Sequence, residues 1–541
     1  MSSAAGNSDS SGATLDQARE SRGLDWLRAW ALYSPEAVAF EDADGARAYT
    51  YGSLYYLSCR LASKLERDYG VARGDRVTIL SKNELEYVAL FFAIQRLGAI
   101  MVPINFRLAA REIDHILRDS DSKLLVVQKQ FADTIAHVAN APKHVWRLDQ
   151  NDEGDSVSDF IAKSLAEFAN EKVATLSQTH EWTFDFRGVM DAACMILYTS
   201  GTTGAPKGAL ITNKMLHWNS LNTGLRLNLC QSDVAISFLP FFHTSGWNVL
   251  VTPFVHRGGK TILVKKFDAQ RILELSAKEK VTIMFGVPTI LEMMSRTEAF
   301  KTSDLSTVRY VIVGGEPMSI ELIRTWQKKG VPVRQGFGLT EVGPSVFSLN
   351  EEDALRKIGS IGSPNFYVEA RIVADGAVGK ARGAEPSEVP PGDIGELILR
   401  GPVCTPGYWR NPEATAKAIQ DGWFHTGDLV RRDADGYWYV AGRKKDMYIS
   451  GGENVYPVEV ETYLSTHPAI REVAVIGTPD EKWGEVGKVF ISLKAGFTLS
   501  EKDVLNHCRE GLAKYKVPKH VLFLADLPKG DSGKILKRAL I

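Results

Sequence analysis

Short apolar runs alternate with longer helix-like segments along most of this 541-residue chain. The strand-like runs cover residues 76–80, 123–127, 261–264 and 282–285. The helix-like segments include residues 54–69 and 84–97, whose length and periodicity are typical of helices. Because strands that are buried on both faces read as nearly continuous apolar runs, the alternation predicts an α/β fold with sheets buried between helices.

A separate, smaller unit is predicted at the C-terminal end. A strand-like run at residues 437–441 leads into the charged sequence GRKKD at residues 442–446, where a domain junction fits. Beyond it we expect, in order, a helix at 457–464, strands at 471–476 and 488–493, a helix at 501–512 and a strand at 520–524. About one hundred residues suffice for a small domain, and a mobile domain of this kind often closes an active site.

The predicted organisation is therefore a large multi-sheet N-terminal domain with a small mobile α+β C-terminal lid domain. Residues 1–22 are rich in Ser, Gly and Ala and are expected to be a disordered lead-in. Residues 23–443 are expected to form the large domain, and residues 444–541 the lid. Two stretches that are polar or rich in Gly and Pro, at about 149–183 and 374–393, are expected to be loops.

Composition excludes several classes of partner. The chain carries 64 Lys and Arg against 65 Asp and Glu, so it has no global basic field, which argues against nucleic acid. The apolar stretch at residues 87–104 is interrupted by Gln95, Arg96 and Gly98 and falls short of the roughly 20 apolar residues of a membrane span, so no stable membrane insertion is expected. The five cysteines form no CxxC pair. We expect a cytoplasmic protein, and a homodimer is left open.

A glycine-rich loop follows one of the apolar runs. Residues 195–208, MILYTSGTTGAPKG, begin as a buried strand and continue as a loop of Gly, Ser and Thr. The backbone N–H groups, the hydroxyls and the Lys207 ammonium of such a loop can bind phosphate oxygens. It is not a Walker A loop, because Lys207 is followed by Gly208 and another strand-like run, not by Ser or Thr and a helix. A polyphosphate ligand is predicted in preference to an ordinary flexible turn.

Four further motifs follow in the sequence. They are PFFHTSG at 240–246, VIVGGE at 311–316 with RQGFGLTE at 334–341, WFHTGD at 423–428 with GR at 442–443, and PKGDSGK at 528–534. Each alone has an ordinary explanation, such as a core histidine or a glycine turn. In this order, and with the glycine-rich loop, they resemble the motifs of the acyl-adenylate-forming superfamily, which includes acyl-CoA synthetases, luciferases and the adenylation domains of peptide synthetases. The wording GGENVYP at 451–457 is similar to that of fatty-acyl and feruloyl-CoA ligases.

The resemblance implies which residues bind ATP and Mg²⁺. The phosphate-binding residues would be Thr199, Ser200, Gly201, Thr202, Thr203, Gly204 and Lys207. The adenine site would be formed by Gly315, Glu316, Gln335, Gly336 and Phe337, where Phe337 replaces the usual tyrosine and keeps its stacking face. Asp428 and Arg443 would bind the ribose, Thr340 the α-phosphate, and Glu341 with Thr203 the Mg²⁺ ion.

The resemblance also implies the residues of the chemistry. Lys534 would be the adenylation lysine, which reaches in from the lid, and His243 would lie beside the carboxylate tunnel. The lid would rotate about Lys445 between the two half-reactions and bring Gly451, Gly452 and Glu453 towards the site of coenzyme A. An apolar tunnel would be lined by Phe241, Phe242, Trp247, Val313 and Gly338.

The expected function is that of an ATP-dependent acid–CoA ligase. The expected partners are a small carboxylic acid, ATP and coenzyme A, with Mg²⁺ as cofactor, and the acid would be apolar: fatty, aryl or sterol-derived. One alternative keeps the adenylation step but delivers the acyl group to a separate carrier protein. A second alternative is a non-catalytic acyl or nucleotide sensor on the same fold; Glu341, Asp428 and Lys534 argue against it.

Overall fold

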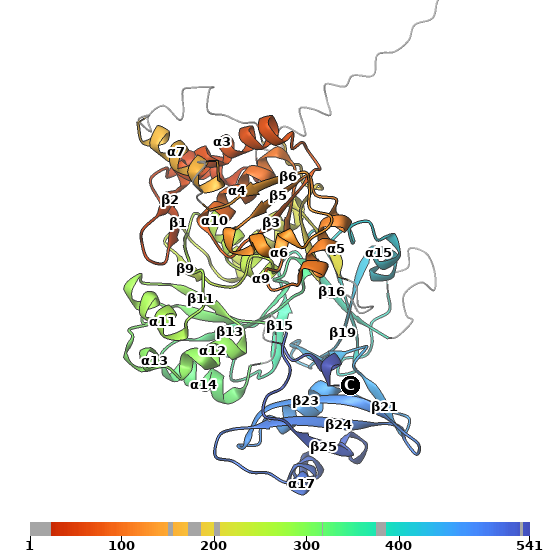
Figure 1. Cartoon of the computed structure of the whole chain (residues 1–541). Helices are drawn as coiled ribbons and strands as arrows, with labels where there is room; N and C mark the ends of the chain where they lie inside the picture. The colour runs from red at the N-terminus through yellow and green to blue at the C-terminus, as the bar shows by residue number, and fades with distance from the viewer. Residues whose placement is uncertain are drawn as a thin grey trace, which may run out of the picture.

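The computed structural model describes residues 23–149, 155–170, 186–199, 206–315, 318–374, 386–530 and 534–540. The lead-in expected at residues 1–22 lies outside the described residues. A large N-terminal body built on two sheets occupies most of the chain, and a smaller C-terminal lobe lies below it in Figure 1. The α/β class expected from the sequence is confirmed.

The first sheet of the large body has six strands in the order β6-β5-β3-β4-β7-β8. Its strands are β3 (Arg76–Leu80), β4 (Ile100–Pro103), β5 (Leu124–Val127), β6 (His144–Arg147), β7 (Ala193–Thr199) and β8 (Lys207–Thr212). All neighbours pair in parallel except β7 and β8, which are antiparallel. The glycine-rich loop therefore connects two antiparallel strands and does not lead into a helix.

The second sheet has fourteen strands among the described residues, along the path β16-β17-β19-β20-β15-β14-β13-β12-β11-β9-β10-β1-β2, with β18 beside β19. Its strands are β1 (Val38–Asp42), β2 (Ala48–Thr50), β9 (Val234–Ser237), β10 (Lys260–Leu263), β11 (Ile283–Gly286), β12 (Tyr310–Val313), β13 (Val333–Phe337), β14 (Phe347–Ser348), β15 (Ser360–Pro364), β16 (Glu369–Val373), β17 (Gly395–Arg400), β18 (Ile419–Gln420), β19 (Trp423–Arg432) and β20 (Trp438–Arg443). Along this path, the strands from β13 to β1 pair in parallel. The strand β2 is antiparallel to β1, and the strands from β14 to β20 are antiparallel to their neighbours.

Helices cover these sheets. Those of the large body are α2 (Trp26–Tyr33), α3 (Tyr51–Tyr69), α4 (Leu85–Leu97), α5 (Ala110–Ser120), α6 (Ala132–Ala136), α7 (Val157–Asn170), α8 (Asn213–Arg226), α9 (Thr244–Asn248), α10 (Val251–Arg257), α11 (Ala269–Lys278), α12 (Pro288–Ser295), α13 (Glu298–Thr302), α14 (Ile320–Lys328) and α15 (Pro412–Ala418). The helix α3 shows why such segments are helical: the Thr50 side chain accepts from the Ser53 N–H at its start, and Gly70 ends it in a left-handed conformation. The helix α4 is buried along its whole length, as its apolar sequence requires.

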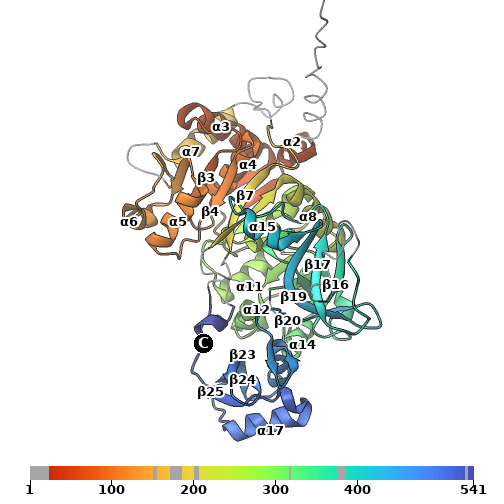
Figure 2. The same cartoon turned by 90° about the vertical axis from the view of Figure 1, so that its right-hand side faces the viewer.

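The small lobe contains a five-stranded sheet. Its strands are β21 (Tyr448–Ser450), β22 (Glu453–Val455), β23 (Ile470–Asp480), β24 (Gly484–Leu493) and β25 (His520–Phe523), and its helices are α16 (Pro457–Leu464) and α17 (Glu501–Gly511). Val460, Val475, Val489 and Cys508 bring both helices and the central strands into one core. Figure 2 shows this lobe beside α14 of the large body.

The prediction of a loop at about residues 149–183 is wrong in part, because the helix α7 lies within that stretch. Val157 and Ile161 are buried in the main core on the face that α7 turns towards α3, while Phe160 packs against that core. The alternation of these apolar residues with Ser, Asp and Lys gives an amphipathic helix that a count of polar residues hides. Among the described residues, no helix is long and apolar enough to cross a membrane.

Candidate active site

Both parts of the chain line one cavity of about 3440 Å³. The large body contributes the ends of β12 and β13 and the loops that follow them, and the small lobe contributes the residues around Lys534. In open α/β sheets, ligands bind beyond the carboxyl ends of parallel strands, which is where this cavity lies. Of the predicted site residues, the cavity wall includes Thr199, Lys207, His243, Gly315, Gln335, Gly336, Phe337, Thr340, Glu341, Asp428, Arg443, Lys445 and Lys534.

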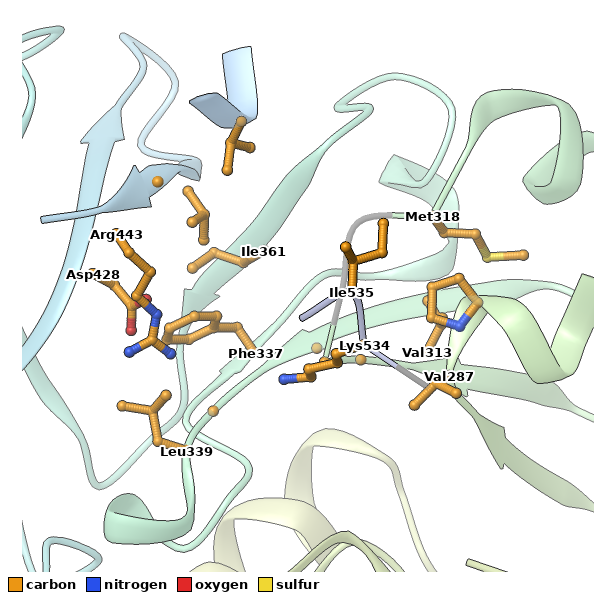
Figure 3. Close-up of a pocket in the computed structure, with 18 of the residues that line it drawn as sticks. Val287, Val313, Met318, Phe337, Leu339, Ile361, Asp428, Arg443, Lys534 and Ile535 are labelled. Atoms are coloured by element: carbon orange, nitrogen blue, oxygen red, sulfur yellow. The ribbon is translucent and has the colours of Figure 1, made fainter. Parts of the chain in front are cut away.

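Lys534 is held by the small lobe and reaches into this cavity. Its loop, residues 528–536, is closed by bonds from the Gly530 N–H to the Lys534 carbonyl (2.7 Å) and from the Leu536 N–H to the Pro528 carbonyl (2.8 Å); residues 531–533 lie outside the described part. The neighbouring Lys529 pairs with Glu472 on β23, which fixes the loop to the lobe. In Figure 3 the Lys534 amine points towards Phe337 and the Asp428–Arg443 pair.

Gly315 explains how the lysine side chain fits. A β-carbon placed on Gly315 would lie 3.5 Å from Cε of Lys534 and 3.7 Å from Val287, so any side chain there would fill the space beside the lysine. The backbone of Gly315 also has a φ of +88°, in the left-handed region that favours glycine. The strand β12 therefore ends in a turn that admits Lys534 between the two parts of the chain.

Asp428, which is buried, forms an ion pair on the opposite wall with Arg443, whose side chain is 43% exposed. They are cross-strand partners on β19 and β20, and Nε of Arg443 lies 2.6 Å from Oδ1 of Asp428. Burial raises the pKa of Asp428 to about 6, although Arg443 and Lys534 oppose that shift. The second carboxylate oxygen, Oδ2, is buried and accepts no hydrogen bond from the described residues. An oxygen of this kind suits the hydroxyl groups of a ribose.

Between these walls, β13 presents a flat ring and an amide. Phe337 lies at the cavity, with its ring nearly perpendicular to that of Phe347 and the ring centroids 5.9 Å apart. An aromatic ring at the cavity wall can stack on a planar ligand. Nε2 of Gln335 is buried with no hydrogen-bond partner in the described part of the chain. A β-carbon on Gly338 would meet the carbonyl oxygen of Pro344 at 1.4 Å, so only glycine permits this return of the chain. These features fit an adenine.

Glu341 lines the same cavity and supplies a carboxylate to it. Its Oε1 accepts a hydrogen bond of 3.0 Å from the hydroxyl of Tyr408, and the Lys207 ammonium lies 5.6 Å from the centre of the Tyr408 ring. Mg²⁺ is usually held by one or two carboxylates together with substrate phosphates, and Glu341 supplies such an oxygen. The residues present therefore fit Mg²⁺ bound with ATP.

Tyr408 was not predicted from the sequence. It reaches Glu341 because residues 407–409 pair with the edge of β8, where the Trp409 N–H donates to the Gly208 carbonyl at 2.7 Å. The two segments are about 200 residues apart, and nothing in the sequence GYWR marks the tyrosine as part of a site. Only the tertiary pairing identifies it.

His243 enters the cavity from the start of α9. Asn83 fixes the preceding turn, because its Nδ2 donates to the Leu239 carbonyl (2.9 Å) and its Oδ1 accepts from the Phe241 N–H (3.1 Å). The prediction of which residues line the apolar tunnel is partly wrong. Phe241 stacks on Trp247 at 4.2 Å, and both are core residues, since the short turn directs only Phe242 and His243 to the cavity. Val313 and Gly338 do line it.

Several predicted residues are not brought to the site. Gly451, Gly452 and Glu453 are exposed in the hairpin of β21 and β22 and are not among the residues that line the cavity, although Asn454 of the same hairpin is. The predictions for Ser200, Gly201, Thr202, Thr203, Gly204 and Glu316 fall outside the described residues. The observed arrangement thus places Lys534, and not Gly451 or Gly452, at the cavity.

Comparison with known families agrees with this geometry. The AMP-binding enzyme model matches residues 27–409, and the model of the AMP-binding enzyme C-terminal domain matches residues 459–534. The chain belongs to the AMP-binding enzyme family. Its motifs and its two-part architecture are those of an AMP-forming acid–CoA ligase, which uses ATP, Mg²⁺ and coenzyme A.

Relatives cover nearly the full chain. A feruloyl-CoA synthase from Amycolatopsis sp. is 38% identical over 512 residues, covering 95% of this chain and 97% of that protein. A long-chain-fatty-acid–CoA ligase of Mycobacterium tuberculosis is 36% identical over 521 residues, covering 96% and 98%. The crystal structure of ATP-bound MatB from Rhodopseudomonas palustris superposes with a TM-score of 0.83 at 31% identity, covering 95% of this chain and 98% of that one.

Proposed function

We propose that this ligase activates an apolar acid, and that Lys534, Thr340, Glu341 and His243 act in its adenylation. The observation that carries the proposal is the position of Lys534. The small lobe delivers its ammonium to a cavity whose other walls hold Asp428, Phe337 and Glu341. A cation so placed meets the two anions that have to approach each other, the acid and the α-phosphate.

In the first half-reaction, a carboxylate oxygen attacks the α-phosphorus of ATP. The new oxygen–phosphorus bond gives the acyl adenylate, and the bond to the β-phosphate oxygen breaks and releases pyrophosphate. Lys534 and Lys207 reduce the repulsion between the anions, and Thr340 donates its hydroxyl to the α-phosphate. Mg²⁺ held by Glu341 would neutralise phosphate charge. His243 and Phe242 orient the acid at the mouth of its pocket.

In the second half-reaction, the thiol sulfur of coenzyme A attacks the acyl carbon. A carbon–sulfur bond forms, the bond to AMP breaks, and the thiol proton passes to solvent. Lys534 is not needed for this step. We propose that the small lobe turns about Lys445, withdraws Lys534 and brings the hairpin at Gly451, Gly452 and Glu453 to the thiol. Glycines there would let the backbone approach the pantetheine closely.

The class of acid is argued from the wall near His243. Leu227, Val249, Phe285 and Ile312 line the cavity there and belong to one apolar cluster. That surface suits a fatty, aryl or sterol-derived acid, and the relatives named for ferulate and for long-chain fatty acids support an apolar one. We also propose a cytoplasmic location, since all five cysteines are free thiols. The homodimer stays a prediction.

The test supplies ATP, Mg²⁺ and a panel of fatty, aryl and sterol-derived acids, with and without coenzyme A. We expect release of pyrophosphate with an acid of the panel and a thioester only when coenzyme A is present. Adenylation without thioester formation would instead support transfer to a carrier protein. If no acid released pyrophosphate, the proposal would be wrong and a sensor would be favoured.

A further inference from the structure

One arm of the cavity lies between α8 and the face of the large sheet. Phe285, Ile312 and Arg334 form a row across three parallel strands: Phe285 pairs in register with Ile312, and Ile312 with Arg334. Residues paired in this way point to the same face of a sheet. All three line the cavity, as do Thr223 and Leu227, which lie one helical turn apart at the end of α8.

Two glycines connect this arm to the nucleotide side. Two residues beyond the row are Gly314, just after β12, and Gly336 on β13, and a β-carbon on Gly314 would lie 3.3 Å from the Gly336 carbonyl oxygen. No side chain therefore separates the arm from the end of β13, where Phe337 stands. An acid whose carboxylate lies beside His243 would place its tail over these glycines and into the arm.

A hydrogen-bonded network closes the far end of the arm. Nη2 of Arg334 donates to the Arg226 carbonyl at 2.9 Å, and Nε of Arg334 lies 3.3 Å from a carboxylate oxygen of Glu351. Nη2 of Arg226 donates to the carbonyl of Ser348 and to the side chain of Asn350, both at 3.1 Å. The arm is consequently a pocket with a floor and not an open tunnel.

This floor is polar and has surplus positive charge. It contains the guanidinium of Arg334, which lines the cavity, and next to it the guanidinium of Arg226 and the carboxylate of Glu351, which do not line it. Burial and the neighbouring Arg334 lower the pKa of Arg226, which is the effect expected where two cations share too little negative charge. An additional electron-rich group at the floor would stabilise both guanidinium groups.

Thr223 supplies a second and independent observation. Its side chain is 1% exposed, and its Oγ1 has no hydrogen-bond partner among the described residues, although it lies on the cavity wall. A buried hydroxyl without a partner costs stability, so it is expected to find one in a ligand. Beyond the apolar walls of Leu227, Phe285 and Ile312 thus lie two polar groups, the Thr223 hydroxyl and the Arg334 guanidinium.

We propose that the acid carries an oxygen acceptor at the end remote from its carboxylate, and that Thr223 and Arg334 bind this oxygen. The inference rests on the proposed function, because it takes the arm as the acyl pocket. A hydroxyl, carbonyl or second carboxylate on a compact ring would satisfy both groups. A long unbranched chain would instead press a methyl group against buried charge, which is unfavourable. The substrate class is therefore an oxygen-substituted aryl or cyclic acid.

The test compares three acids of one skeleton: 3-phenylpropenoic acid and its para-hydroxy and para-carboxy derivatives. Pyrophosphate release gives kcat and KM for the full-length enzyme and for Thr223→Val and Arg334→Met. We expect at least tenfold lower KM for one oxygen-bearing acid than for the unsubstituted acid, with similar kcat. Thr223→Val should reduce this selectivity about fivefold, and Arg334→Met by tenfold or more.

Arg309→Met is the matched control. Arg309 contacts the same Tyr310 ring but pairs with Asp233 and does not line the cavity, so its loss should leave the selectivity unchanged. Equal use of the three acids by the parent enzyme, or an unchanged selectivity in Thr223→Val, would overturn the inference. If Arg334→Met does not fold, the selectivity of the isosteric Thr223→Val variant is sufficient to test the inference. Pyrophosphate release with no acid, of this set or of the wider panel, would overturn the proposed function and the inference together.

Discussion

At the scale of single residues, the proposed mechanism gives Lys534 a role in adenylation alone. Replacement of Lys534 by alanine removes the cation between the acid and the α-phosphate, so adenylation should slow by roughly 10² or more. Thioester formation from preformed acyl adenylate should change little. Rapid-quench assays of each half-reaction measure the two rates separately.

Lys519→Ala provides the control for that experiment. Lys519 is on the same lobe and pairs with Asp480, and neither residue lines the cavity, so both half-reactions should be preserved. An equal loss of both half-reactions in Lys534→Ala would contradict the division of labour.

The pKa of Asp428 predicts how nucleotide binding depends on pH. Since burial raises this pKa to about 6, the carboxylate is ionised at neutral pH and becomes protonated as the pH falls through 6. Protonation removes an acceptor for the ribose hydroxyls and weakens the pair with Arg443, so the affinity for ATP should fall. Titration calorimetry between pH 5 and 8 measures this dependence.

Asp428→Asn separates the protein's titration from that of the nucleotide. The variant should bind ATP more weakly at pH 7.5 and retain only the pH dependence that belongs to ATP itself. If wild type and variant showed the same pH profile, Asp428 would not be the titrating group.

Site residues could be predicted where a sequence motif contains them. They could not be predicted where only the pairing of distant segments brings them to the site. Asp428 and Lys534 were predicted because a known order of motifs names them. Tyr408 could not be, since its contact with Glu341 depends on the pairing of residues 407–409 with β8. Thr223 was missed for a related reason: within α8 it reads as an ordinary helical threonine, and its unpaired hydroxyl is visible only in the folded chain.

At the scale of elements, strong local patterns predicted the small lobe well. The helix expected at residues 457–464 has the bounds of α16, and the one expected at 501–512 differs from α17 by one residue. Both have clear signals: Pro457 at the first position of α16 and a Ser500–Asp503 capping box in α17. The helix α7 was missed because it lies between polar segments and its apolar face is narrow.

Substitutions on the narrow apolar face of α7 should lower the stability of the protein without changing catalysis. Ile161 of α7 is 3% exposed in the main core, so Ile161→Ala should cost about 2 to 4 kcal/mol and lower the unfolding temperature of the large body. Its kcat for adenylation should be unchanged. Lys163→Ala, on the exposed side of the same helix, should change neither. A loss of activity at full stability would mean that α7 acts on the site.

At the scale of the whole molecule, the observed arrangement is held partly by surface charge. Nζ of Lys494 on the loop after β24 lies 3.5 Å from a carboxylate oxygen of Glu321 on α14, and the Glu321 side chain is 83% exposed. An exposed pair contributes at most about 1 kcal/mol. Glu321→Ala should therefore slow adenylation by no more than about fivefold while thioester formation is maintained or increased.

High salt should have the same effect on the two half-reactions of the wild type as Glu321→Ala has, because salt screens exposed charges. Glu298→Ala is a suitable control, since Glu298 pairs with Lys301 within α13 and touches only the large body. An effect of Glu321→Ala on both half-reactions alike would show that the pair does not select between arrangements of the lobe.

The attachment of two segments to one lobe has a kinetic consequence. The loop of Lys534 is fixed to β23 through Lys529, and the hairpin of Gly451 is joined to β24 through β21, so neither can move without the other. When Lys534 lies in the cavity, Gly451 and Gly452 of the hairpin lie outside it. If the lobe turns as proposed, the catalytic cycle runs as a ping-pong sequence: pyrophosphate departs before the thiol enters, and the acyl adenylate stays bound in the protein until coenzyme A arrives.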